Sequence, residues 1–181
     1  MTASTHQSTD WNDRFLALFD KCAILYRKGN HDYESYYDAA DRELLAETGH
    51  APREFFDFVE DHCEFGNPSP TTALLVAAVR RDYFEVVMEG KEGTRSVTSN
   101  DVPSRGEELD GIPYLPRILA KARAKLRGDL DPDLMFCCGG DRSFLQRVGG
   151  IHPADFLRRV WAAEDDDSKI VAWLREQPQT P

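Results

Sequence analysis

Two thiols, two glycines and a cation lie within six residues of the sequence, in the segment Cys137–Arg142. Asp141 is predicted to cap a short helix, so that Gly139 and Gly140 stand just before the helix start. Backbone N–H groups at such a start can hold an anion, and Arg142 would assist them. A thiol near this positive end would have a lowered pKa and act as a nucleophile or a redox thiol. The alternative is that both cysteines are small buried hydrophobic residues and that Asp141 is only a cap.

Catalysis by a thiol needs a base, and His152 is the candidate because it follows the Asp141 helix, directly before Pro153. It could approach Cys137 or Cys138 in space and complete a Cys–His pair. The sequence contains neither a phosphate-loop nor a dinucleotide-binding fingerprint. Cys137, Cys138 and His152 are therefore the catalytic candidates, and an enzyme of unknown reaction is an alternative to a binding function.

A predicted helix over residues 117–127 carries five positive side chains. Such a helix can bind an acidic protein surface or a phosphorylated small molecule. It can equally be a solvated amphipathic helix whose later charges favour its C-terminal end. Together with the glycine turn, it supplies the candidate ligand-binding residues, which are Lys121, Arg123, Arg142, Gly139 and Gly140.

The sequence does not group His, Cys, Asp and Glu residues at the spacings that are typical of a metal site. Asp57 and Asp61 are four residues apart and share a helix face, whereas the adjacent His62 and Cys63 point elsewhere. The acidic run 165–167 precedes the last predicted helix, where carboxylates favour the helix dipole. The spacings typical of zinc sites are absent from the sequence. We therefore expect no metal and no cofactor.

Apolar periodicity, caps and helix-opening prolines predict a mostly α-helical protein. The expected helices run from Trp11 to about residue 26, from Asp41 to Gly49, from Pro52 to Gly66, over 71–88, from Pro116 to Gly128, from Asp141 to Gly149, from Pro153 to Trp161 and over 167–175. The helix over 71–88 is the most apolar and is predicted to be central and buried, although 84–88 alone could form a strand.

The order of elements predicts how the chain is divided. Residues 1–10 are expected to form a disordered tail, and residues 11–90 a first helical unit with the central helix. Residues 91–111 lack periodicity and are the predicted linker, and residues 112–177 form a second helical unit. Both units are expected to belong to one globular domain.

The two predicted units repeat one pattern at an offset near 100 residues. Lys21 matches Lys121, and Asp41 matches Asp141. The remaining matches are mainly stops, helix-opening prolines and apolar residues: Leu45 with Leu145, Gly49 with Gly149, Pro52 with Pro153, Phe55 with Phe156 and Val59 with Val160. The predicted fold is therefore a helical domain of two similar tandem units packed on a central apolar helix.

The segment Gly111–Ala124 reads Gly-Ile-Pro-Tyr-Leu-Pro-Arg-Ile-Leu-Ala-Lys-Ala-Arg-Ala. It resembles the signature of an uncharacterised bacterial family, domain of unknown function 5069. The motifs at 20–23, 79–84 and 137–142 are similar to those of its longer members, and the resemblance extends from about Trp11 to Trp173. This family implies no activity, so the resemblance carries over no catalytic residue.

Composition narrows the functional classes. The 181 residues contain 22 Lys and Arg against 32 Asp and Glu, a formal net charge of −10, which argues against a general binder of the nucleic-acid backbone. The longest strongly apolar run, 73–79, is far shorter than the ~20 residues of a membrane helix. Without a disulfide framework or a signal peptide, a cytoplasmic location is expected. The leading expectation is a binding or regulatory module for a small anion or an acidic protein, and a scaffold or oligomer subunit is a further alternative.

Overall fold

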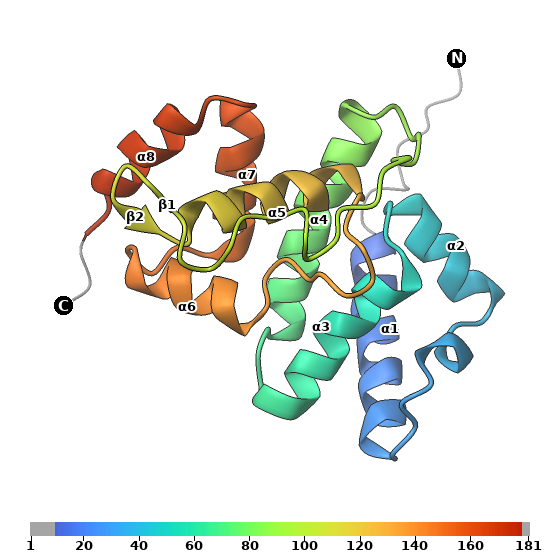
Figure 1. Ribbon diagram of the computed structural model, residues 1–181. Helices are drawn as coiled ribbons and strands as arrows, with labels where there is room; N and C mark the ends of the chain where they lie inside the picture. Colours follow the sequence, from blue (N-terminus) through green and yellow to red (C-terminus); the bar gives the residue numbers. More distant parts are fainter. Residues whose placement is uncertain (1–9, 179–181) are drawn as a thin grey trace. The chain divides into compact units, whose positions relative to one another are not determined.

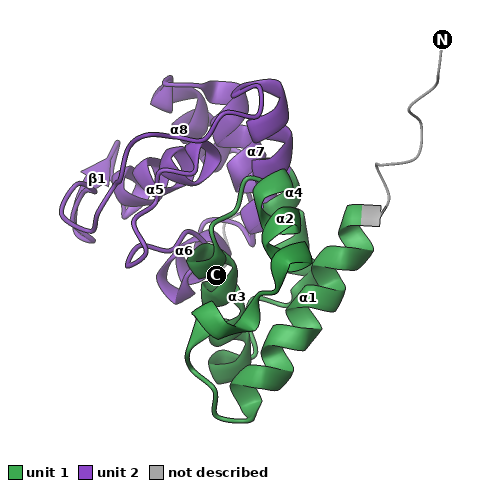
Figure 2. Ribbon diagram, turned by 90° about the vertical axis from the view of Figure 1, so that its right-hand side faces the viewer, with its two compact units in different colours: residues 1–78 green, residues 79–181 purple. Residues whose placement is uncertain are grey.

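The computed structural model describes residues 10–178, which form eight α-helices, a short 3₁₀ helix and two short paired strands (Figure 1). The mostly helical class is thereby confirmed. The elements are α1 (Asp10–Arg27), η1 (Tyr33–Tyr36), α2 (Ala39–Glu47), α3 (Pro52–Phe65), α4 (Pro70–Val86), β1 (Glu108–Leu109), β2 (Ile112–Pro113), α5 (Leu115–Arg127), α6 (Gly139–Arg147), α7 (Pro153–Ala163) and α8 (Asp167–Arg175). The chain divides into two compact units between Ala78 and Val79, within α4 (Figure 2).

The first unit is built around the contact of α1 with α3, and α2 and η1 add to the same core. Its centre is aromatic: the rings of Phe15 and Phe55 meet edge to face, with centroids 4.9 Å apart. Phe19 and Phe56 are buried beside them. Large apolar side chains of this kind recur every three or four residues along α1 and α3, so that each helix buries one continuous face.

The second unit is built around α5, which packs against α7 and the β1 strand, while α7 packs against α8. Leu119 and Ala122 of α5 and Phe156 and Val160 of α7 are buried. In the hairpin, β1 and β2 run antiparallel, with Leu109 opposite Ile112. The buried side chains of α5 are mainly aliphatic, but they include Lys121 and Lys125.

Prolines and glycines mark the helix ends, as the sequence predicts. Pro52 and Pro153 occupy the first turns of α3 and α7. Gly128 ends α5 with φ of +68°, a left-handed conformation that disfavours other residues. A Cβ atom at Gly128 would also collide with the guanidinium of Arg80, which is buried at 2% exposure. Glycine is therefore required there for two separate reasons.

The predicted caps of the two short helices are wrong by three residues. Asp38, not Asp41, caps α2, and its side chain accepts the backbone N–H of Asp41. Cys138, not Asp141, is the capping residue of α6, so that Gly139 and Gly140 are its first helical residues. The sequence pattern missed these starts because Asp41 and Asp141 are used for other contacts, at the third helical position of each helix.

The apolar segment 71–88 is helical to Val86, so that residues 84–88 do not form a strand. It is not buried throughout: Val76 and Val79 are buried, whereas Val86 is 71% exposed. Among the described residues, no helix is both long enough and apolar enough to cross a membrane.

The predicted linker, residues 91–111, lies within the second compact unit. Val97 forms a parallel bridge with Leu130, and the carbonyl of Pro103 accepts a hydrogen bond from Arg117 at 2.8 Å. These contacts hold the segment on the α5 side of its own unit. Of the predicted tail, residues 1–9 lie outside the described part of the chain, and Asp10 begins α1.

Candidate functional site

Lys121 is buried in the second unit and forms an ion pair with Asp141. The Nζ atom of Lys121 lies 2.6 Å from Oδ2 of Asp141, and the two side chains are 2% and 0% exposed. The same ammonium group donates a hydrogen bond to Sγ of Cys138 at 3.3 Å. We call Lys121, Asp141, Tyr114, Cys137 and Cys138 the Lys121 cluster. Because a buried charge is costly unless paired, the contact with Asp141 is what allows Lys121 to be buried.

Asp141 is the centre of this cluster. Its Oδ1 accepts a hydrogen bond from the Tyr114 hydroxyl at 2.9 Å, and its Oδ2 accepts one from the Cys137 backbone N–H at 2.8 Å. Burial and the Asp141 charge raise the pKa of Tyr114, which keeps the hydroxyl protonated as a donor. Tyr114 and Cys137 both have left-handed backbones, with φ of +74° and +73°. Such strain persists only where surrounding contacts hold it.

The cysteines of the cluster differ in their surroundings. Cys137 is fully buried, and burial raises the pKa of its thiol to about 12. The lowered pKa predicted for a thiol at this helix start is therefore wrong for Cys137, because burial outweighs the nearby Arg142. Cys138 is partly exposed at the N-terminal end of α6.

Arg142 and His152 both have structural contacts. The Arg142 Nη1 atom donates a hydrogen bond to the Cys137 carbonyl at 2.7 Å, which holds the strained turn. His152 is the N-cap of α7, and its Nδ1 accepts the Ala154 backbone N–H at 3.2 Å. The role that the structure gives to His152 is thus a helix cap.

The first unit contains an exposed counterpart of the buried ion pair. Lys21 of α1 lies 2.5 Å from Asp41 and 3.0 Å from Asp38, and its side chain is 39% exposed. The hydrogen bond to Asp41 is the main cause of the raised pKa of Lys21. The same two positions of the sequence pattern therefore form an ion pair in each unit, but only the pair of the second unit is buried.

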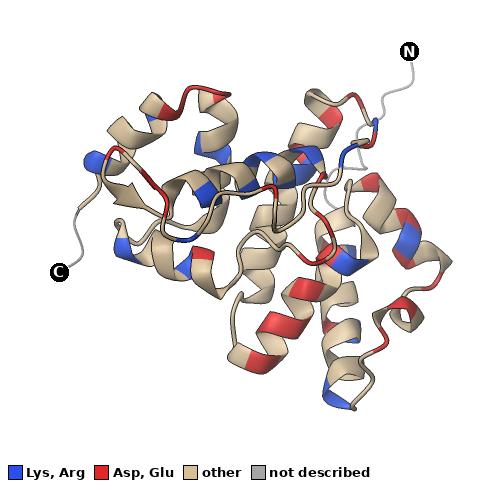
Figure 3. Cartoon of the chain, in the orientation of Figure 1, with Lys and Arg blue, Asp and Glu red and all other residues tan. Residues whose placement is uncertain are grey.

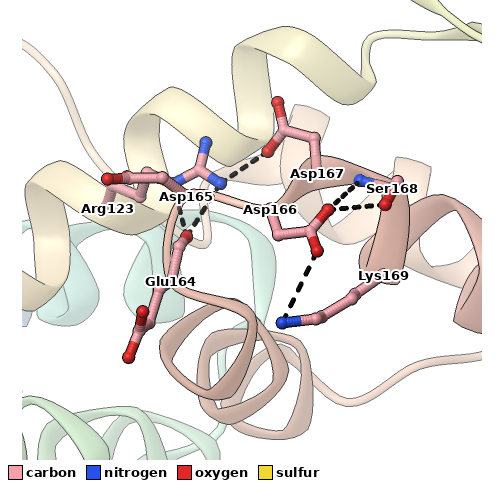
Figure 4. A network of polar contacts seen from close by, with 7 residues as sticks. All are labelled: Arg123, Glu164, Asp165, Asp166, Asp167, Ser168 and Lys169. Carbon is pink, nitrogen blue, oxygen red and sulfur yellow. Dashed lines mark hydrogen bonds and ion pairs between the residues drawn. The ribbon is translucent and has the colours of Figure 1, made fainter.

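Positive charge follows α5 along its length (Figure 3), but the structure separates the residues predicted to bind one ligand. Lys121 and Lys125 are buried, at 2% and 1% exposure. The Arg123 guanidinium donates two hydrogen bonds to the Glu164 carbonyl, at 3.2 and 3.0 Å, and pairs with Asp167 at 2.5 Å (Figure 4). Lys121, Arg142, Gly139 and Gly140 gather at α6, whereas Arg123 faces the end of α7 and the start of α8.

A surface pocket of about 360 Å³ lies beside Arg123, a volume within the roughly 300–1,000 Å³ of ligand sites. Its lining residues come from α4 and the residue that follows it, from α5, and from α7 and the turn after it. They are two aromatic residues, three aliphatic residues and four charged residues: Tyr83, Trp161, Val87, Leu126, Val160, Arg123, Arg127, Glu164 and Asp165. We call this set the Trp161 pocket.

The Trp161 pocket contains two features that could contact a ligand, an aromatic pair and the guanidinium of Arg127. Tyr83 and Trp161 form an edge-to-face pair with centroids 5.4 Å apart, which provides an aromatic wall. Arg127 is 38% exposed and pairs through Nε with Asp129 at 2.9 Å. Within residues 10–178, the two Nη atoms of Arg127 have no hydrogen-bond partner, so they remain available. A flat apolar group against the wall and an anionic group on Arg127 would match this chemistry.

Sequence reasoning identified Arg123 but missed the rest of the Trp161 pocket. Tyr83, Arg127 and Trp161 lie far apart in the sequence, and no spacing links them. Tyr114 was missed in the same way, although it stands within the Gly111–Ala124 segment. Among the described residues, no group of three or more His, Cys, Asp or Glu side chains is placed to hold a metal ion.

Comparison with known proteins finds a family match for the second part of the chain. Residues 99–181 match the family described as "Domain of unknown function (DUF5069)". No curated protein and no solved structure matches the chain. The matched region contains the whole Lys121 cluster and all of the Trp161 pocket except Tyr83 and Val87.

Proposed function

We propose that this chain, whose residues 99–181 match the family of domain of unknown function 5069, is a binding protein for a small organic anion. The ligand would occupy the Trp161 pocket. The observation that carries the proposal is that Arg127 and the Tyr83–Trp161 aromatic pair line one pocket of ligand size.

The charges of the pocket favour an anion with a single negative charge. Glu164 and Asp165 line the same pocket as the two arginines, and Asp165 is fully exposed. Arg123 is already bonded to Glu164 and Asp167, which leaves Arg127 as the main contact for an anion. A polyphosphate would be repelled by the two carboxylates, whereas a planar monocarboxylate would meet one guanidinium and the aromatic wall.

Binding to an acidic protein surface through α5 receives less support. Such a surface needs several free cations, but Lys121 and Lys125 are buried and Arg117 donates to the Pro103 carbonyl. A thiol enzyme and a scaffold or oligomer subunit stay alternative predictions, as does a cytoplasmic location.

The test is ligand-dependent stabilisation of the purified chain. A panel of aromatic and aliphatic monocarboxylates, with phosphate and sulfate for comparison, would be screened by thermal shift and by tryptophan fluorescence. We expect an aromatic monocarboxylate to raise Tm and to quench Trp161. Arg127→Gln should abolish both effects, since it removes the charge but keeps donors for Asp129. Arg158→Gln is the control, because Arg158 pairs with Asp155 outside the pocket. If no panel member gives a signal that Arg127→Gln removes, the proposal fails.

We also propose that the two units are copies of one repeated helical unit. In support, α1 packs against α3 as α5 packs against α7, and the pairs Lys21–Asp41 and Lys121–Asp141 join matching helices. An experimental structure in which α1–α3 and α5–α7 do not superpose would contradict this proposal.

A further inference from the structure

Three of the four cysteines are poorly suited to react. Burial raises the pKa of Cys22 and of Cys137 to about 12, and it also raises the pKa of the partly exposed Cys63. Because the thiolate is the reactive form of cysteine, these three thiols are expected to be slow nucleophiles at neutral pH.

Cys138 combines partial exposure with a direct contact between its sulfur and a lysine. Its Sγ atom accepts a hydrogen bond from the Lys121 ammonium group at 3.3 Å. It also stands at the N-cap of the nine-residue helix α6, where no side-chain cap bond occupies it. A cation and a helix N-terminus both stabilise negative charge on sulfur.

Cys138 is also less buried than its neighbour Cys137. Cys138 is partly exposed, and the two residues that follow it, Gly139 and Gly140, are exposed and have no side chains to cover the sulfur. Lys121, in contrast, is 2% exposed and fixed by Asp141, so that its ammonium group cannot turn away from Sγ into solvent. The contact therefore joins the thiol of a partly exposed residue to a buried, paired lysine.

We propose that Cys138 is a site of reversible oxidation by peroxides, with Lys121 as the residue that positions and stabilises the reacting sulfur. The sulfur attacks one oxygen of hydrogen peroxide, an S–O bond forms and the O–O bond breaks. The thiol proton leaves with the released hydroxide as water. The products are one sulfenic acid on Cys138 and one water, so the two-electron oxidation of sulfur balances the reduction of the peroxide.

The next step requires a thiol from outside the chain. The adjacent Cys137 is a poor partner, because a disulfide between neighbouring residues closes a strained ring and because Cys137 is buried in a left-handed conformation. A small free thiol attacks the sulfenic sulfur instead, giving a mixed disulfide and water. A second such thiol then attacks the mixed disulfide and restores Cys138.

The experiment treats the full chain with hydrogen peroxide and traps sulfenic acid with a dimedone reagent. Peptide mass spectrometry then gives the labelling rate at each cysteine. We expect Cys138 to be labelled about ten-fold or more faster than Cys63, the other partly exposed thiol. Cys138→Ser should remove this label, whereas Cys137→Ala should keep it. Equal rates at Cys138 and Cys63 would overturn the proposal.

The role of Lys121 needs its own variant. In the double variant Lys121→Met, Asp141→Asn, the ion pair is removed without leaving a buried charge, and the introduced amide oxygen can still accept a hydrogen bond from Tyr114. The rate of Cys138 alkylation is then measured from pH 6 to 10, with circular dichroism as the check on folding. We expect the double variant to be alkylated at Cys138 more slowly than wild type, because the hydrogen bond from Lys121 to the sulfur is lost. A folded double variant with an unchanged profile would refute the role of Lys121. Lys21→Met is the matched control, because it removes a lysine from the exposed pair of the other unit.

Discussion

The buried and exposed ion pairs allow one substitution to be compared in two environments. Lys121→Met and Lys21→Met each remove an ammonium group that contacts an aspartate at the third position of a short helix. Methionine keeps most of the apolar stem of lysine. The two variants therefore differ mainly in the burial of the charge left behind.

The expected magnitudes follow from that burial. Lys121→Met leaves Asp141 unpaired at 0% exposure, and breaking a buried pair in this way costs about 3–5 kcal/mol. Lys21 is 39% exposed and Asp41 is 16% exposed, so water compensates much of the lost attraction. An exposed pair contributes about 0.2–1 kcal/mol, which is the expected cost of Lys21→Met.

The assay is urea-induced unfolding at pH 7, followed by circular dichroism for wild type and both variants. We expect Lys121→Met to lower the free energy of unfolding by at least about 2 kcal/mol more than Lys21→Met does. The double variant Lys121→Met, Asp141→Asn should recover part of the loss, because no buried charge remains. If Lys121→Met lowers the free energy of unfolding no more than Lys21→Met does, burial does not increase the contribution of the Lys121–Asp141 pair.

Three further predictions concern backbone, packing and pH. Glu164 has φ of +55° and ψ of −119°, so Glu164→Gly should raise stability by about 1 kcal/mol in the same urea assay; a loss would show that no strain is stored there. Gly140→Ala should cost about 1–3 kcal/mol, because its Cβ would lie 2.9 Å from the Tyr114 hydroxyl oxygen. Gly139→Ala, whose nearest contact is 3.8 Å, is the tolerated control, and equal Tm values for the two variants would contradict this reasoning. The pKa of Cys137 is raised to about 12 in the folded state, so the folded protein keeps this thiol proton at pH values where the unfolded chain has lost it. The stability that this difference contributes is fully present below the ordinary thiol pKa, and it is lost as pH rises from there to about 12. Above pH ~9, wild type should lose about 1 kcal/mol per pH unit more than Cys137→Ala, as measured by urea unfolding, and parallel pH curves would exclude this effect.

The binding proposal and the oxidation proposal rest on separate groups of the second unit. The first depends on Arg127 and Trp161, and the second on Lys121 and Cys138. Arg127→Gln should therefore leave the peroxide reactivity of Cys138 unchanged, and Cys138→Ser should leave anion binding unchanged. The two proposals can fail independently of each other.

The sequence alone determined most of the helices of this protein. Prolines at the first turns of α3 and α7, and glycines after α3 and α5, act on the backbone within a few residues, so their effects can be read locally. The predicted starts of α2 and α6 were wrong because Asp41 and Asp141 resemble caps in sequence, whereas their side chains bind lysines from distant helices.

Only the tertiary structure decided what the charged residues do. Lys21 and Lys121 occupy matching positions in the sequence, yet one is exposed and the other is buried, because burial depends on which distant segments pack around a side chain. The same holds for the Trp161 pocket, in which Tyr83, Arg127 and Trp161 come from three different helices. Local patterns fix where helices begin and end, whereas the dielectric environment of a charge and the walls of a pocket arise from contacts between segments far apart in the chain.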